Sequence, residues 1–226
     1  MNVYFLVEGK TEKKIYPRWI AQLIPQLQCV ATYDQVRQNN YYIFSGGGYP
    51  QILDVHLSNA IVEVNEVGKY DYLVVALDAD EVTVDERLEE VKKEMAKKEE
   101  LKLEGSCQLQ VIIQNRCMET WFMGNQAVFP RNPTQNFRKF FQFYNVAQND
   151  PEAMLKPNEF IGSIAQFHKK YLKEMLREKN ISYSEKIPNE VGEPHYLEQL
   201  EKRVENYAEH LKTLQIFLAF CKTLSK

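Results

Sequence analysis

Short β-rich runs alternate with amphipathic stretches through the first 130 residues of the chain, and this alternation constrains the fold more than any other feature. The runs at Val3–Val7, Tyr41–Phe44, Tyr70–Leu77 and Leu109–Ile113 have the length and the aliphatic and aromatic content of strands. Between them, apolar residues recur at the period of a helix that lies on one face of a sheet. Strands that alternate with helices build a mainly parallel sheet, so the sequence predicts an α/β fold.

The stretches between the runs predict the helices of this fold. They cover Lys13–Leu27, Pro50–Val67, Val82–Leu103 and Cys117–Asn125. The run Tyr70–Leu77 has the apolar character of a strand that is buried on both faces of a parallel sheet. We therefore expect residues 1–130 to form a layered, Rossmann-like α/β domain with helices on the faces of the sheet.

Beyond residue 130 prolines divide the chain into short pieces and no strand pattern is present, so residues 131–226 are expected to form a helical extension packed on the first domain. Helices are predicted over Phe160–Lys179 and Tyr196–Leu224. In the second of these, apolar residues alternate spacings of three and four, as in a coiled coil. We favour an amphipathic helix packed on its own chain, because its apolar face is wider than a two-stranded seam. A homodimer through this helix is the alternative.

Charge is distributed unevenly along the chain. The net charge is -3, but residues 131–226 carry 15 Lys and Arg against 12 Asp and Glu. Non-specific affinity for nucleic acid grows with the number of phosphates that a protein neutralises. The overall acidity therefore argues against a protein that coats nucleic acid by charge alone, and it leaves room for a local basic groove.

Neither membrane insertion nor a metal site of the zinc type is predicted. No apolar run approaches the roughly 20 residues that span a bilayer, and the N-terminus lacks the basic region of a signal peptide, so we expect a cytoplasmic protein. The four cysteines lie far apart and the four histidines have no ligand spacing. We expect the histidines of the second half, including His168, to be surface residues.

Acidic residues follow the strands, at the edge where a parallel α/β sheet has its active site. Glu8 follows the first strand, Asp78 and Asp80 follow Tyr70–Leu77, and Glu119 lies in the short helix after the fourth strand. In extended backbone the side chains of Asp78 and Asp80 would point the same way. Crowded carboxylates repel one another unless a cation lies between them, and oxygen ligands alone favour Mg²⁺, Mn²⁺ or Ca²⁺. Helix N-capping is the alternative role for each residue.

Two further segments are candidates for contact with a ligand. Gly46, Gly47 and Gly48 follow the second strand, where successive amides can bind an anion, although a tight turn explains the glycines equally well. Arg131, Arg138 and Lys139 are interleaved with aromatic residues, which makes residues 131–144 a candidate nucleic-acid or partner surface. Packing of the extension on the sheet is the alternative for these aromatic residues.

Three short motifs, taken in order, resemble the Toprim family, and especially its stand-alone and OLD-type nuclease members. They are LVEGKTE after the first predicted strand, LDAD after the third and METW in the short helix, and the resemblance covers residues 1–127. It implies that Glu8, Asp78 and Asp80 hold one or two Mg²⁺ or Mn²⁺ ions. It also implies that Glu119 is a further catalytic carboxylate.

The resemblance implies a divalent-metal-dependent nuclease that acts on DNA or RNA, in a prokaryotic defence system with a protein partner. Lys10 or Lys13 would then contact phosphate, and Lys186 lies where such proteins often have another basic residue. The alternative enzyme is a haloacid-dehalogenase-like phosphatase, because residues 78–82 fit a D-x-D-x-(T/V) pattern. That family, however, has its motif on the first strand. A non-catalytic interaction or sensor protein with a Toprim fold is the third hypothesis.

Overall fold

The computed structural model describes residues 1–97 and 102–225, and its centre is a parallel five-stranded sheet. The strand order is β2-β3-β1-β4-β5, and every pair is parallel. The strands are β1 (Asn2–Val7), β2 (Gln28–Cys29), β3 (Asn40–Ser45), β4 (Tyr72–Asp78) and β5 (Gln108–Gln114). The predicted α/β class with a mainly parallel sheet is confirmed. The additional strand, β2, has two residues and lies at an edge, too short for a sequence pattern.

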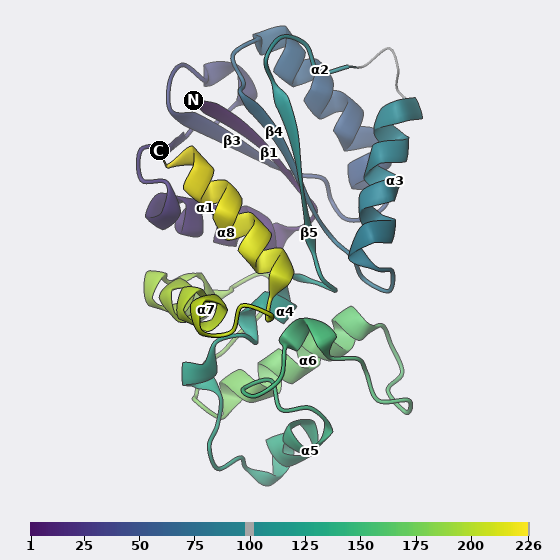
Figure 1. The fold of residues 1–226 in the computed structure, drawn as a ribbon, viewed down its shortest axis with the longest axis vertical. Coiled ribbons are helices and arrows are strands. Elements are labelled where there is room, and N and C mark those ends of the chain that lie inside the picture. Colours follow the sequence, from purple (N-terminus) through teal and green to yellow (C-terminus); the bar gives the residue numbers. More distant parts are fainter. Residues whose placement is uncertain (98–101, 226) are drawn as a thin grey trace.

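Helices cover both faces of the sheet (Figure 1). Those of the first half are α1 (Lys10–Leu23), α2 (Leu57–Val67), which a π-helical turn at Ile52–His56 precedes, and α3 (Val84–Lys97). Alternate residues of β1 point to opposite faces, so Phe5 packs with α1 while Leu6 packs with α2. The predicted helix over Val82–Leu103 corresponds to α3, and residues 98–101 of that prediction lie outside the described residues.

The second half of the described chain is helical, as predicted. Its helices are α4 (Met118–Phe122), α5 (Gln135–Phe143), α6 (Ile164–Arg177), α7 (Pro194–Asn206) and α8 (Lys212–Leu224). Figure 1 shows α4, α5 and α6 beyond the carboxyl ends of the strands, whereas α8 returns along the sheet. Short 3₁₀ turns lie between the helices at Gln126–Val128, Pro151–Ala153 and Asn189–Gly192, and another, Tyr33–Gln35, precedes β3.

The prediction of one long helix over Tyr196–Leu224 is wrong, because α7 and α8 are separate helices. Between them Leu211 has a φ of 51°, which an α-helix does not allow. Tertiary hydrogen bonds hold this turn: the amide of Leu211 donates to Asp150 Oδ1 at 3.0 Å, and buried Arg203 donates to His210 Nδ1 at 2.7 Å. These contacts override the helical period of the sequence.

The apolar seam of the expected coiled coil is turned into the protein's own core. Leu197 and Leu200 of α7 are fully buried there, as are Leu214 and Cys221 of α8. A dimer through one continuous helix therefore has no basis in this structure.

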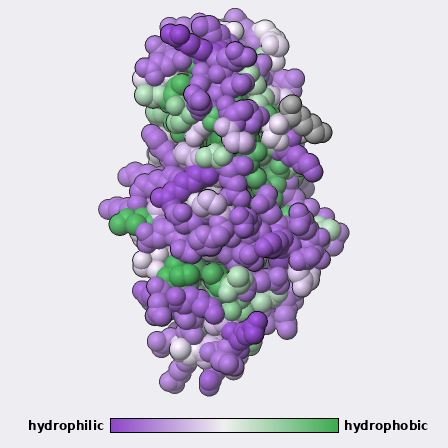
Figure 2. All heavy atoms as spheres, turned by 90° about the vertical axis from the view of Figure 1, so that its left-hand side faces the viewer, coloured by the Kyte–Doolittle hydropathy of each residue, from purple (hydrophilic) through white to green (hydrophobic). Residues whose placement is uncertain are grey.

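One hydrophobic cluster runs across the predicted boundary at residue 130. It joins Phe5 and Trp19 from the first half with Phe137, Tyr171 and Phe217 from the second. The boundary itself stays a prediction. Figure 2 shows one face of the molecule, which is mostly hydrophilic with separate apolar patches. In the described part of the chain no helix is both long and apolar enough to cross a membrane.

Candidate functional site

The strands β1 and β4 are neighbours in the sheet, and the chain leaves them in opposite directions. After β1 it enters α1 on one face, and after β4 it enters α3 on the other. The crevice at such a reversal is the usual ligand site of open α/β sheets. Glu8 directly follows β1 and Asp78 ends β4, so two of the predicted site residues lie at this point.

The register of the sheet fixes these two residues against each other. The amide of Glu8 donates to the carbonyl of Ala76 at 2.9 Å, which continues the pairing of β1 with β4. The amide of Asp78 then donates to Glu8 Oε2 at 2.9 Å. On the other side Asp78 pairs with Gln114, the last residue of β5. Three adjacent strand ends therefore place their side chains around one spot.

Glu12 belongs to this group, although the sequence interpretation missed it. It lies in the first turn of α1 and is only 4% exposed. The amide of Gln114 satisfies its neighbours when its nitrogen donates to Asp78 Oδ1 and, at 3.2 Å, to Glu12 Oε1, while its oxygen accepts from the Tyr16 hydroxyl. The signal for Glu12 was an acidic residue in the first turn of the helix that directly follows the end of β1.

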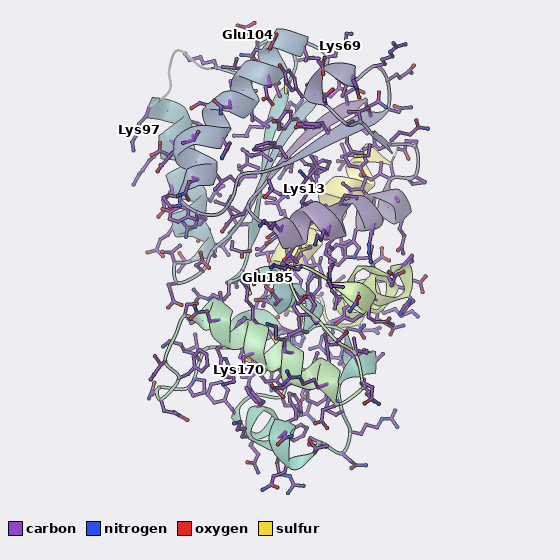
Figure 3. The ribbon with its side chains drawn as sticks, turned by 180° about the vertical axis from the view of Figure 1, so that it is seen from behind. Lys13, Lys69, Lys97, Glu104, Lys170 and Glu185 are labelled. Carbon is purple, nitrogen blue, oxygen red and sulfur yellow. The ribbon has the colours of Figure 1, made fainter. Side chains whose placement is uncertain are left out.

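Glu119 reaches the group from α4 and is 2% exposed. The hydroxyl of Tyr183 donates to Glu119 Oε1 at 2.8 Å. Lys169 of α6 pairs with Glu185 at 2.9 Å, and Figure 3 shows Glu185 between α6 and α1. Burial lowers the pKa of Lys169, but the carboxylates of Glu119 and Glu185 outweigh burial and raise it. The second half of the chain thus supplies a hydroxyl and a cation beside the carboxylates.

Burial and the charges of neighbouring carboxylates raise the pKa values of Glu8, Glu12 and Asp78. Burial raises the pKa of Asp78 well above its ordinary value, and the charges of Glu12 and Glu8 raise it further. Burial and the charges of Glu8 and Glu119 raise the pKa of Glu12 to about 7. Burial also raises the pKa of Glu8, against the hydrogen bond from the Asp78 amide. The cluster is defined as Glu8, Glu12, Asp78, Asp80 and Glu119, and the repulsion within it opposes the simultaneous ionisation of its carboxyl groups.

Asp80 does not have the extended backbone that the sequence interpretation assumed. Its φ is 51°, in the left-handed region, and its amide donates to the carbonyl of Arg116 at 2.9 Å. The expectation that Asp78 and Asp80 share one direction through an extended strand is therefore wrong, because β4 ends at Asp78. Burial raises the pKa of Asp80, while the charges of Arg87 and Lys169 lower it.

The glycines after β3 fasten their loop to the end of β1. The amide of Gly46 donates to the carbonyl of Val7 at 2.8 Å, and that of Gly48 to the carbonyl of Glu8 at 3.0 Å. Two of the three amides that an anion nest would use are therefore already bonded. A Cβ on Gly46 would lie 2.8 Å from Ile52 Cβ, so close packing explains this glycine.

The remaining predicted residues lie away from the cluster or have other roles. Lys10 and Lys13 of α1 are exposed, and so is Lys186, whose carbonyl accepts from the Lys14 ammonium. His168, expected at the surface, is fully buried between the hydroxyl of Thr120 at 2.8 Å and the carbonyl of Met154 at 2.9 Å. Because both ring nitrogens have hydrogen-bond partners, this polar ring can be buried.

Whether this cluster suits a divalent cation depends on its donors and on their present bonds. Within residues 1–97 and 102–225, no group of three or more His, Cys, Asp or Glu side chains is arranged to hold a metal ion. Glu119 is bonded to Tyr183, Asp78 to Gln114 and Glu8 to the Asp78 amide. The donors themselves are carboxylate oxygens, which suit Mg²⁺ and Mn²⁺. The residues fit such a cation by their chemistry, and binding requires that they exchange these hydrogen bonds for it.

Comparison with known proteins gives one result. Residues 7–173 match the model of a family described as a domain of unknown function, DUF4276. The match begins at the end of β1 and extends into α6, so it includes the five carboxylates of the cluster and Lys169. No curated protein and no solved structure matches the chain.

Proposed function

Since the chain belongs to the DUF4276 family, whose description names no function, we propose from the site itself that this protein is a divalent-metal-dependent nuclease. The observation that carries the proposal is the gathering of acidic side chains around the sheet reversal, where Glu12 and Glu119 are buried and Glu8 and Asp78 are half-buried. Buried carboxylates with few cations nearby are costly unless they have a role. A cation that binds there would remove the repulsion.

In this proposal Glu8, Asp78 and Asp80 hold Mg²⁺ or Mn²⁺. When bound, such an ion supplies a Lewis acid for the phosphate group and a water of lowered pKa. Glu12 and Glu119 are then the carboxylates that accept or hold a proton beside the ion. Lys169 offers positive charge on the same side as Glu119, where it favours a phosphate oxygen.

Nucleic acid is the proposed substrate because the helix beside the carboxylates is basic. Lys169, Lys170 and Lys173 all belong to α6, and Lys169 is the one that lies toward Glu119. The half of the chain that contains α6 carries the excess of Lys and Arg. We extend the proposal to a cytoplasmic role in prokaryotic defence with a protein partner, which rests on the resemblance to stand-alone Toprim proteins.

The test is a cleavage assay with plasmid DNA, single-stranded DNA and RNA, each with Mg²⁺, Mn²⁺ or EDTA. We expect cleavage with either metal, and a loss of at least about 100-fold in Asp78→Asn and Glu8→Gln. The matched control is Asp54→Asn, because Asp54 is exposed and lies in the π-helical turn. Unchanged cleavage in Asp78→Asn would refute the proposal.

A wild-type protein that cleaves none of these substrates, and whose melting temperature Mg²⁺ and Mn²⁺ leave unchanged, would also refute it. A ligand at 100 times its Kd stabilises a protein by about 2.7 kcal/mol, so binding is visible in thermal unfolding without any activity. An aspartyl-phosphate trapped on Asp78 would instead support the phosphatase alternative.

A further inference from the structure

A hollow of about 220 Å³ lies in the second half of the protein, outside the carboxylate cluster. It is formed by α5, α6 and the segment 157–160. Aromatic rings and ammonium groups dominate its lining, which includes Lys139, Phe140, Phe143, Phe160, Phe167 and Lys170. Phe140 and Phe167 belong to the hydrophobic core and Phe160 packs against it, whereas Phe143 is exposed.

The rings of the hollow have a fixed arrangement. Phe167, which is 3% exposed, forms the floor. The ring centroid of Phe143 lies 5.3 Å from that of Phe167, and the ring centroid of Phe160 lies 5.2 Å from it, both in edge-to-face geometry. Phe143 is nevertheless 41% exposed, so part of its ring is open to a ligand. The packing on Phe167 holds the two outer rings in place, which lowers the entropy cost of stacking against them.

The rim of the hollow is positively charged. The Lys139 ammonium lies 5.4 Å from the centroid of Phe140, and that of Lys170 lies 5.6 Å from the centroid of Phe160. Lys156 does not line the hollow, but its ammonium donates to the Phe160 carbonyl at 3.2 Å. Glu159 is the acidic residue of the lining. A ligand with negative charge beside an aromatic or apolar group matches this rim.

The size and chemistry of the hollow favour one occupant. Sites for drug-sized ligands measure roughly 300–1,000 Å³, so this smaller hollow suits a single ring system. Proteins that bind single-stranded nucleic acid combine positive charge for phosphates with aromatic rings on which bases stack. In a duplex the bases are stacked inside and do not reach such rings. An apolar peptide side chain would fill the hollow but would leave its lysines without phosphate or carboxylate partners.

The helix α6 connects the hollow with the carboxylate cluster. Lys170 lines the hollow, and its neighbour Lys169 faces Glu119 and Glu185. Successive residues of a helix are turned by roughly 100°, so the two lysines serve different sides of α6. Figure 3 shows Lys170 on the side of α6 away from the sheet, whereas Glu185 lies toward the sheet.

We infer that the hollow binds one base of a single-stranded nucleic acid whose backbone passes over α6 toward the carboxylates. The inference rests on the proposed function, because it names the substrate class and the place where that substrate is held. Its ring contacts come from Phe143 and Phe160, and its phosphate contacts from Lys139 and Lys170. It makes the protein selective for single strands over duplexes.

Fluorescence anisotropy of a labelled 12-mer of deoxythymidine, in EDTA, tests this directly on the full chain. An abasic 12-mer and a 12-base-pair duplex serve as comparison ligands. We expect Phe143→Ala to weaken binding of the thymidine 12-mer by about 5- to 100-fold, and Phe143→Trp to retain it. Binding of the abasic strand should be the same in wild type and Phe143→Ala. Ile216→Ala is the matched control, since Ile216 is 50% exposed on α8.

Equal binding of the thymidine 12-mer by wild type and Phe143→Ala would overturn the inference, and so would equal affinity of wild type for the thymidine and abasic strands. Tighter binding of the duplex than of the thymidine 12-mer would also overturn it. Cleavage assays of wild type and Phe143→Ala, read beside the binding data, separate the two proposals. Stacking-dependent binding without any cleavage by wild type would leave this inference standing and refute the nuclease. If Phe143→Ala changes neither cleavage nor binding, the nuclease proposal stands and this inference is refuted.

Discussion

The main-chain amide of Asp78 donates a hydrogen bond to Glu8 Oε2, and this 2.9 Å contact links the ends of two adjacent strands through one side chain. The position of Glu8 is therefore set by the sheet and not by the loop that follows it. Because both residues lie where the chain leaves the sheet in opposite directions, a change in either one alters the electrostatics of the whole cluster.

Replacement of Asp78 by asparagine should stabilise the protein at pH 8 in EDTA. Asparagine keeps the shape of the side chain and removes a charge that Glu12 and Glu8 repel. We expect a gain of about 1 kcal/mol, which for a chain of this size raises the melting temperature by about 2–4 °C. Differential scanning calorimetry measures this shift. The exposed Asp54→Asn should change it little, and a lower melting temperature for Asp78→Asn would show that the charge is not repelled.

Replacement of Tyr183 by phenylalanine should destabilise the protein. The hydroxyl of Tyr183 is the donor to Glu119 Oε1 at 2.8 Å in a buried position. Loss of a donor to a buried charged group costs about 1–3 kcal/mol. Urea unfolding at pH 8 measures the loss. The double variant Tyr183→Phe, Glu119→Gln should recover part of it, and Tyr207→Phe at a half-exposed tyrosine should be close to neutral.

Stability should fall as the pH rises from about 4.5 to about 7, in part because of Glu152. Burial raises its pKa from 4.5 to about 7, against hydrogen bonds from Thr213. The folded protein therefore keeps this proton after the unfolded chain has lost it, so stability present below pH 4.5 is lost through this window. A shift of this size is worth about 3 kcal/mol at most.

The Glu152→Gln variant tests this dependence because it cannot ionise. Its free energy of unfolding should change less between pH 4.5 and pH 8 than that of wild type, by about 1–3 kcal/mol. Urea unfolding at both pH values gives the difference. Glu209→Gln, at an exposed residue, is the control. The same pH slope in wild type and Glu152→Gln would contradict the raised pKa.

Replacement of Gly124 by alanine should destabilise the turn between α7 and α8. An added Cβ would lie 2.3 Å from Leu211 Cδ1 and 3.1 Å from the carbonyl of Trp121. Leu211 is fully buried and cannot move freely. We expect the overpacking to lower the free energy of unfolding by about 1–3 kcal/mol, which urea unfolding measures. At Gly192 the Cβ would meet the flexible side chain of Arg18, at 2.9 Å, so Gly192→Ala should cost less. A larger loss of stability in Gly192→Ala than in Gly124→Ala would contradict the close contact between Gly124 and Leu211.

The strands and the sheet-edge carboxylates were predictable because they depend on local patterns. The apolar run of β4 and the acidic residues Glu8 and Asp78 follow from strand content and from the common edge of a parallel sheet. Glu12 was within reach of the same reasoning, since it lies in the first turn of the helix that follows the strand end at Glu8.

Other features depend on contacts between distant parts of the chain. The break before Leu211 comes from Asp150 and Arg203, and no glycine or proline marks it. The burial of His168 depends on Thr120 and on the carbonyl of Met154. Such long-range partners produce no periodic pattern in the sequence. The helical spacing of apolar residues therefore continues across the break between α7 and α8.

The position of α8 affects the order in which the protein folds. Phe220 of α8 packs on Tyr72 of β4 at 5.4 Å, and the carbonyl of Leu224 accepts from Gln26, 198 residues away in sequence. The strands of the described chain are all made before α8. On the face of the sheet that α8 covers, the part over β4 and β5 therefore lacks that helix until it has been translated, whereas α1 already packs beside β3. Contacts of such long sequence separation form slowly. The nascent chain therefore exposes apolar surface between the synthesis of β5 and that of α8, and chaperones that bind such surface should engage it before α8 closes the core.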